Sequence, residues 1–147
     1  MILLLFNSWD LKESNNTIYD IHDGGTTPWY VVRDLGGALG STGTFRVKRN
    51  DIERFSRSQF VTGVTGRGFV TFAYRGKLPH LVRNTITVDD VVWATGLLAA
   101  IPDQQWRDAF RAAGYPAELG DRFMEAIRTR IDEAQRLAVP TGSAERR

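Results

Sequence analysis

Cysteine is absent from the sequence, and histidine occurs only at His22 and His80. The lack of cysteine excludes disulfide bonds, thiolate zinc sites and a cysteine nucleophile. Two histidines are too few for a histidine-rich metal site. Because many cytosolic chains also lack cysteine, its absence does not identify the compartment of the protein.

Long hydrophobic runs are also missing. The opening segment MILLLF is apolar, but it is far shorter than the roughly 20 residues that span a bilayer, and it lacks the basic start and cleavage site of a signal peptide. We therefore expect a soluble, cytoplasmic chain without a membrane partner. A first residue rarely leads straight into a buried-looking element, so we interpret MILLLF as the end of a helix or strand whose beginning, with any targeting sequence, has been cut off.

Charge is unevenly distributed along the 147 residues, although the formal net charge is only +2. Residues 44–84 contain nine basic and two acidic residues, whereas residues 85–139 contain nine acidic and six basic ones. A basic stretch with interspersed aromatic residues, such as 44–84, could bind nucleic acid through phosphate contacts and stacking. Alternating aromatic residues more often form the buried face of a hairpin, so we expect core packing here rather than nucleic-acid binding.

Two β-hairpins are predicted in the first half of the chain. Residues 17–19 and 29–33 are β-prone, and the segment DIHDGGTTP between them is rich in turn residues. Residues 59–77 alternate apolar with small or polar residues and have glycines at their bends, which indicates a second hairpin or an extended irregular segment stiffened by strands. The glycine-rich stretch 36–44 lacks the Gly-Lys-Ser/Thr ending of a phosphate-binding loop, so we interpret it as a connector.

Helical patterns dominate residues 85–139. Thr87 is a predicted N-cap followed by two acidic residues, and two further amphipathic segments follow over 102–115 and 117–138. We therefore predict an α+β fold in which hairpins carry a polar loop and a bundle of about three helices follows, all in one domain over residues 1–139. Residues 140–147 are predicted to be a disordered tail. The predicted helical core residues are Trp93, Trp106, Phe110, Phe123 and Ile127.

A polar motif of the form D-L-K-x-x-N occupies residues 10–15, and an Asp-Leu-Gly tripeptide at 34–36 follows the first hairpin. This order resembles the catalytic core of the protein kinase superfamily, in which a D-x-K-x-x-N loop precedes a hairpin and a metal-binding D-[FL]-G motif. The resemblance covers residues 1–43 motif by motif. In the rest of the chain, the resemblance is limited to a high helix content like that of a kinase C-terminal lobe.

The resemblance implies a role for each motif residue in phosphoryl transfer from ATP with Mg²⁺. Asp10 would orient the attacking hydroxyl and accept its proton, and Lys12 would offset charge on the transferred group. Asn15 and Asp34 would be the metal ligands. Gly36, which belongs to the cofactor-binding motif, would turn the backbone sharply after Asp34, together with Gly37. Asn16 is an alternative ligand if the register slips by one residue.

The chain also departs from the kinase pattern. Ser8 and Trp9 replace the usual His-Arg before the catalytic Asp, the hairpin between the motifs is longer, and no Ala-Pro-Glu motif closes the basic segment. The glycine-rich hairpin, strand lysine and helix glutamate of an N-terminal lobe do not precede Asp10. The resemblance therefore implies an atypical, bacterial kinase-like protein seen as a C-lobe fragment, whose partner is the missing lobe and which is inactive without it.

Two other interpretations of the same residues stay open. The chain could be a non-catalytic module that binds a protein or nucleic acid through the basic 44–84 face. Asp20, His22 and Asp23 could form a metal cluster, although such residues are ordinary at a hairpin tip.

Overall fold

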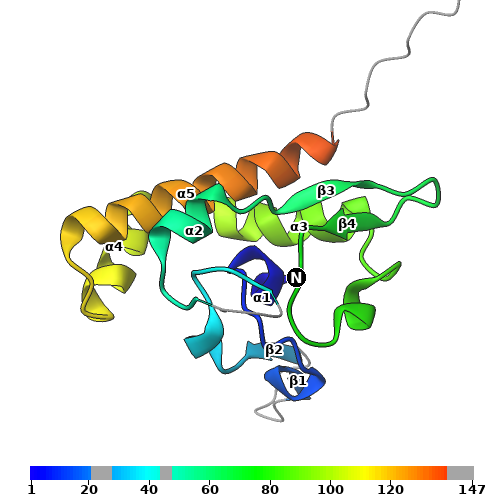
Figure 1. The fold of residues 1–147 in the computed structure, drawn as a ribbon, viewed down its shortest axis with the longest axis horizontal. Coiled ribbons are helices and arrows are strands. Elements are labelled where there is room, and N and C mark those ends of the chain that lie inside the picture. Colours follow the sequence, from blue (N-terminus) through cyan, green and yellow to red (C-terminus); the bar gives the residue numbers. More distant parts are fainter. Residues whose placement is uncertain (21–27, 44–47, 139–147) are drawn as a thin grey trace, which may run out of the picture.

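The computed structural model describes residues 1–20, 28–43 and 48–138. In these residues, five α-helices and two antiparallel hairpins form the α+β fold that the sequence predicts (Figure 1). The helices are α1 (Ile2–Leu5), α2 (Ile52–Arg57), α3 (Val88–Ala99), α4 (Asp103–Ala112) and α5 (Ala117–Gln135). The strands are β1 (Asn16–Asp20), β2 (Pro28–Val32), β3 (Val61–Val64) and β4 (Val70–Phe72). The predicted tail, 140–147, lies outside the described residues.

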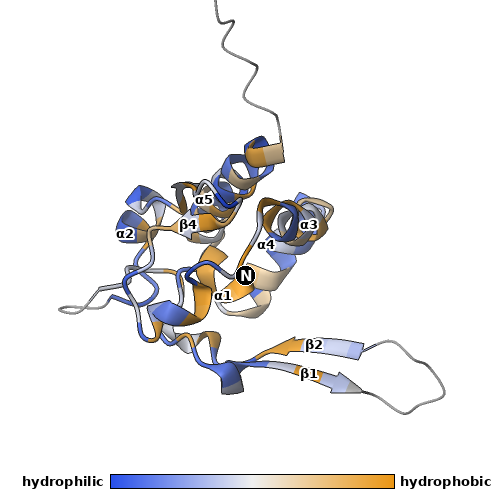
Figure 2. Ribbon diagram, turned by 90° about the vertical axis from the view of Figure 1, so that its right-hand side faces the viewer, coloured by the Kyte–Doolittle hydropathy of each residue, from blue (hydrophilic) through white to orange (hydrophobic). Residues whose placement is uncertain are grey.

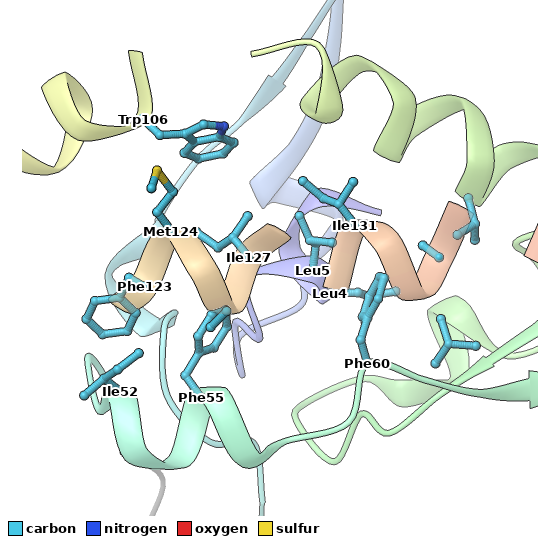
Figure 3. Close-up of a cluster of buried hydrophobic side chains, with 14 of the residues drawn as sticks. Leu4, Leu5, Ile52, Phe55, Phe60, Trp106, Phe123, Met124, Ile127 and Ile131 are labelled. Atoms are coloured by element: carbon cyan, nitrogen blue, oxygen red, sulfur yellow. The ribbon is translucent and has the colours of Figure 1, made fainter. Parts of the chain in front are cut away.

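The longest helix, α5, organises the hydrophobic core. It contacts α1, α2, α3 and α4, and Figure 3 shows side chains from several of these elements converging on it. Phe123 and Ile127 on α5 are fully buried, and Trp106 and Phe110 on α4 are 8% exposed, so these four predicted core residues are confirmed. The two residues of each pair are four positions apart, which places them on one face of their helix.

Trp93 is the exception among the predicted core residues, because its side chain is 70% exposed. Helix α3 instead buries Val91, Ala94 and Thr95, which lie on the face toward α5. At 100° per residue, position 93 falls on the opposite side of the helix from that face. The Trp93 prediction is therefore wrong, because an apolar residue of this helix is buried only where its angular position faces α5. The Thr87 N-cap is confirmed, and it forms a reciprocal capping box with Asp90.

The first hairpin pairs β1 with β2 in the register Thr17 to Val31 and Ile18 to Tyr30. Its tip, including His22 and Asp23 of the possible metal cluster, lies outside the described residues. Figure 2 shows β1 and β2 extending away from the helical body. The second predicted hairpin is also present, since β3 pairs with β4, with an irregularity between Val61 and Gly63.

Two short helices complete the surroundings of the polar motif. The MILLLF segment forms α1, whose Leu3, Leu4 and Leu5 side chains are buried, so the helical alternative for this segment is confirmed. Helix α2 was not predicted from the sequence. Asp51 caps it by accepting a hydrogen bond from the Arg54 backbone N–H at 3.1 Å, and the buried ring of Phe55 anchors it to Phe123. No helix in the described part of the chain is long and apolar enough to cross a membrane.

Candidate functional site

The polar motif lies in a loop that leaves α1 through a tightly held turn. Asn7 takes a left-handed backbone conformation (φ 56°), and its side-chain amide donates to the Gly40 carbonyl at 2.7 Å. The Ser8 backbone N–H donates to the Leu3 carbonyl at 2.8 Å, which closes the helix end. Asn and Asp tolerate left-handed backbone better than other non-glycine residues. The loop therefore starts from a buried and hydrogen-bonded position, which determines where Asp10 lies.

Asp10 and Lys12 form the centre of the site. Lys12 Nζ lies 2.5 Å from Asp10 Oδ2, and the Asp10 side chain is only 11% exposed. Burial alone would raise the pKa of Asp10, but the ammonium groups of Lys12 and Lys77 outweigh it and lower that pKa below its ordinary value. The hydrogen bond to Asp10 raises the pKa of Lys12. At neutral pH the pair is therefore a carboxylate beside an ammonium group.

Lys77, which sequence reasoning treated only as part of the basic stretch, is the second cation at Asp10. Its Nζ lies 3.2 Å from Asp10 Oδ1 and 4.3 Å from the centre of the Trp9 ring. The approach to Oδ1 is outside hydrogen-bond geometry, so this buried oxygen has a charge contact without an aligned hydrogen bond. Because Lys77 is 67 positions from Asp10 in the sequence, no local motif could have identified this contact.

Asn15 is oriented by the backbone of Asp10. Its side-chain Nδ2 donates to the Asp10 carbonyl at 3.1 Å, and the residue is 7% exposed. The amide oxygen accepts no hydrogen bond from the described residues. The alternative residue, Asn16, fits this role less well: its amide nitrogen donates to the Lys12 carbonyl, and its amide oxygen accepts from the Tyr30 hydroxyl.

Asp34 follows β2, which returns the chain to the polar loop. The backbone N–H of its neighbour Arg33 donates to the Asn15 carbonyl at 3.0 Å, and the charge of Asp34 contributes to the raised pKa of Lys12. Asp34 is exposed, and its backbone is left-handed (φ 55°). The hairpin thus returns an unburied carboxylate to the neighbourhood of Lys12 and Asn15.

The glycines after Asp34 act differently from the prediction. Neither Gly36 nor Gly37 has a positive φ; the left-handed residue of this turn is Asp34 itself. A Cβ on Gly36 would meet Asp34 Oδ1 at an ordinary 3.7 Å, whereas a Cβ on Gly37 would lie 2.8 Å from two atoms of the Trp9 ring. Glycine is therefore needed at position 37 because a side chain there would collide with the Trp9 ring. The prediction that Gly36 and Gly37 are needed to turn the backbone after Asp34 is wrong.

Tyr74 and Gly76 hold the segment that carries Lys77 against the polar loop. The Tyr74 hydroxyl lies 2.9 Å from the carbonyls of both Trp9 and Lys77, and it accepts a hydrogen bond from the Leu11 backbone N–H. The Lys77 N–H donates to the Trp9 carbonyl at 2.8 Å. Burial, together with the charge of Asp10, raises the pKa of Tyr74 to about 12, so its hydroxyl stays neutral. These contacts attach the end of the second hairpin to the backbone on both sides of Asp10.

Gly76→Ala is expected to disrupt this attachment. A Cβ at Gly76 would lie 2.5 Å from the Trp9 carbonyl oxygen and closer still to the Tyr74 hydroxyl, so backbone must move. We expect a loss of about 1–3 kcal/mol in the free energy of unfolding, measured by urea titration. Amide exchange at Leu11 and Lys77 should also accelerate.

Gly66→Ala is the matched control for Gly76→Ala. No atom lies within 4 Å of a Cβ built there, and its φ is not in the left-handed range. Its stability should be unchanged or slightly higher, because alanine reduces the entropy of the unfolded chain. Equal stability in both variants would show that the close approach at Gly76 is unimportant.

The basic stretch is partly paired by acidic residues. Arg54 lies 3.6 Å from Asp51, Arg57 lies 3.6 Å from Glu53, and Lys77 contacts Asp10. These contacts reduce the positive charge that the stretch presents to solvent, although exposed ion pairs of this kind are weak.

The chain was compared with protein-family models, curated proteins and solved structures. No protein-family model, no curated protein and no solved structure matches the chain.

Proposed function

We propose that this chain is the C-lobe portion of a kinase-like phosphotransferase that uses ATP and Mg²⁺. The observation that carries the proposal is the arrangement around Asp10: a nearly buried carboxylate paired with Lys12, beside an Asn15 amide anchored to the Asp10 backbone. Phosphoryl transfer requires mainly positioning and charge neutralisation, and these groups can supply both.

Asp10 is assigned to the acceptor hydroxyl. Its lowered pKa keeps it ionised at neutral pH, so it can accept a hydrogen bond from the hydroxyl and take its proton as the new O–P bond forms. Lys12, whose side chain is 42% exposed, can reach toward charge that develops on the transferred group. Removing either group should affect the transition state more than the ground state.

Asn15 and Asp34 are assigned to the metal. Amide and carboxylate oxygens are the hard ligands that Mg²⁺ prefers, and it binds through few protein ligands while keeping several waters. The amide oxygen of Asn15, to which no described residue donates a hydrogen bond, and the exposed carboxylate of Asp34 fit that requirement. When bound, the ion would neutralise phosphate charge.

The kinase resemblance implies a second lobe that covers the nucleotide. We therefore expect the 147-residue chain to bind Mg·ATP weakly and to show little or no turnover in a phosphotransfer assay. Robust turnover by this chain would contradict the assignment of a missing lobe.

Asp34→Asn tests the metal assignment in this chain. In NMR titrations, ATP should bind more tightly with Mg²⁺ than with EDTA, and Asp34→Asn should reduce that Mg²⁺-dependent gain by at least about tenfold. The substitution removes one charge and little volume, and asparagine tolerates the left-handed backbone, so the fold should persist.

Asp132→Asn is the control, because it neutralises an exposed carboxylate on α5. It should leave ATP binding unchanged. If wild-type binding is independent of Mg²⁺, or if both variants behave alike, the kinase-like proposal is contradicted and a non-catalytic binding module replaces it.

A further inference from the structure

Both carboxylate oxygens of Asp10 already have a lysine ammonium group beside them. Lys12 occupies Oδ2 at 2.5 Å, and Oδ1 is buried with the ammonium group of Lys77 3.2 Å away. An acceptor that is to hydrogen-bond the buried Oδ1 must therefore displace the Lys77 head group. Lys77 makes the longer of the two contacts and is the more exposed lysine, 50% against 42%, so it can leave at lower cost than Lys12.

Lys77 combines a held backbone with a head group that can turn. Its N–H donates to the Trp9 carbonyl, and its own carbonyl lies 2.9 Å from the Tyr74 hydroxyl. The Lys77 side chain, in contrast, is 50% exposed and packs over the Trp9 ring. A lysine has a compact charge on a flexible stem, so Nζ can leave Oδ1 without movement of the backbone.

We propose that Lys77 determines acceptor specificity by binding the phosphate group of a hydroxyl-bearing phosphate monoester whose hydroxyl approaches Asp10. The inference rests on the proposed function, because it concerns the acceptor of that same site.

The physical reason is the compensation of charge. An ammonium group that leaves a carboxylate loses a favourable interaction, which is larger near a poorly solvated carboxylate than in bulk water. A neutral acceptor offers Lys77 nothing in place of its interaction with the Asp10 carboxylate. A phosphate replaces that interaction with a charge-assisted hydrogen bond. Because Lys12 stays beside Oδ2, the Asp10 carboxylate keeps one ammonium partner while Lys77 binds the phosphate of the acceptor.

The probe is glycerol 3-phosphate, with glycerol as its neutral counterpart, titrated into the complete chain and followed by NMR. We expect glycerol 3-phosphate to shift the Lys77 side-chain and Trp9 indole signals, and glycerol to shift neither. Lys77→Met should weaken the binding by about tenfold, and Lys77→Arg should retain most of it. Arg67→Met removes the same charge from the turn after β3 and should leave binding within about twofold, as expected for an exposed charge that forms no part of the proposed site.

Three results would overturn the inference. These are equal binding of glycerol and glycerol 3-phosphate, shifts confined to other basic residues, and equal affinity of wild type and Lys77→Met. The mapping of NMR chemical-shift changes uses the wild-type chain, so it tests the inference even if Lys77→Met does not fold. If glycerol 3-phosphate binds at Lys77 but ATP binding never depends on Mg²⁺ or Asp34, the lysine site stands as an anion site and the phosphotransferase proposal fails instead.

Discussion

Arg130→Met should destabilise the protein by about 2–4 kcal/mol, because it removes the donor for several buried carbonyls. Arg130 is 3% exposed and donates to the carbonyls of Leu5, Phe55 and Ser58 at 2.8–3.2 Å. Its guanidinium also lies 4.2 Å from the centre of the Phe55 ring. Met has a similar stem, so the substitution tests the hydrogen bonds more than the packing.

Arg130 connects three elements that position the candidate site. Leu5 ends α1 immediately before the polar loop, and Ser58 follows α2 and also lies within hydrogen-bond distance of the Asn7 side chain. Burial lowers the pKa of Arg130 to about 10, which still leaves it charged at neutral pH. No carboxylate within the described residues forms a salt bridge with it, so the carbonyls must compensate for its loss of solvation.

Arg122→Met on the same helix is the control for Arg130→Met. Arg122 is exposed and pairs with Glu53 at the surface, so its removal should cost less than about 1 kcal/mol. Urea unfolding of the two variants should separate them clearly. A loss at Arg130 no greater than that at Arg122 would show that the buried carbonyls find other partners.

Asp10→Asn should have the largest effect on chemistry. In a longer protein that contains this chain and transfers phosphate, we expect turnover to fall by about 10²–10⁴-fold, because the group that takes the acceptor proton is lost. Nucleotide affinity should change little, since Asp10 is assigned to the hydroxyl and not to the metal. Steady-state kinetics and an independent measurement of nucleotide binding would separate the two effects.

The matched comparisons for Asp10→Asn use Lys12 and Arg67. Lys12→Ala should also lower turnover, because it removes charge stabilisation that matters most in the transition state. Arg67→Ala should leave the basal chemistry unchanged, since Arg67 lies in the turn after β3, outside the proposed site. Full activity in Asp10→Asn would mean that the motif is a coincidence of loop composition.

Much of the architecture could be predicted because its causes are local. Turn residues between β-prone segments predicted both hairpins, and the Thr87 capping signal predicted the start of α3. Asp10, Lys12 and Asn15 lie within six positions, so their mutual contacts follow from one short loop. Local hydrogen bonds and backbone preferences act over a few residues, and the sequence displays them directly.

The remaining features depended on tertiary packing. Lys77 reaches Asp10, and Tyr74 and Gly76 reach the backbone beside it, only because the end of the second hairpin lies against the polar loop, more than 60 positions away in the chain. Trp93 is exposed because α5 covers only one face of α3. Arg130 is buried because carbonyls from two other helices converge on it. The sequence by itself determined the hairpins, the helices of the second half and the residues of the polar motif. Only the tertiary structure decided which distant cations and carbonyls meet, since long-range contacts depend on how faces pack and not on residue type.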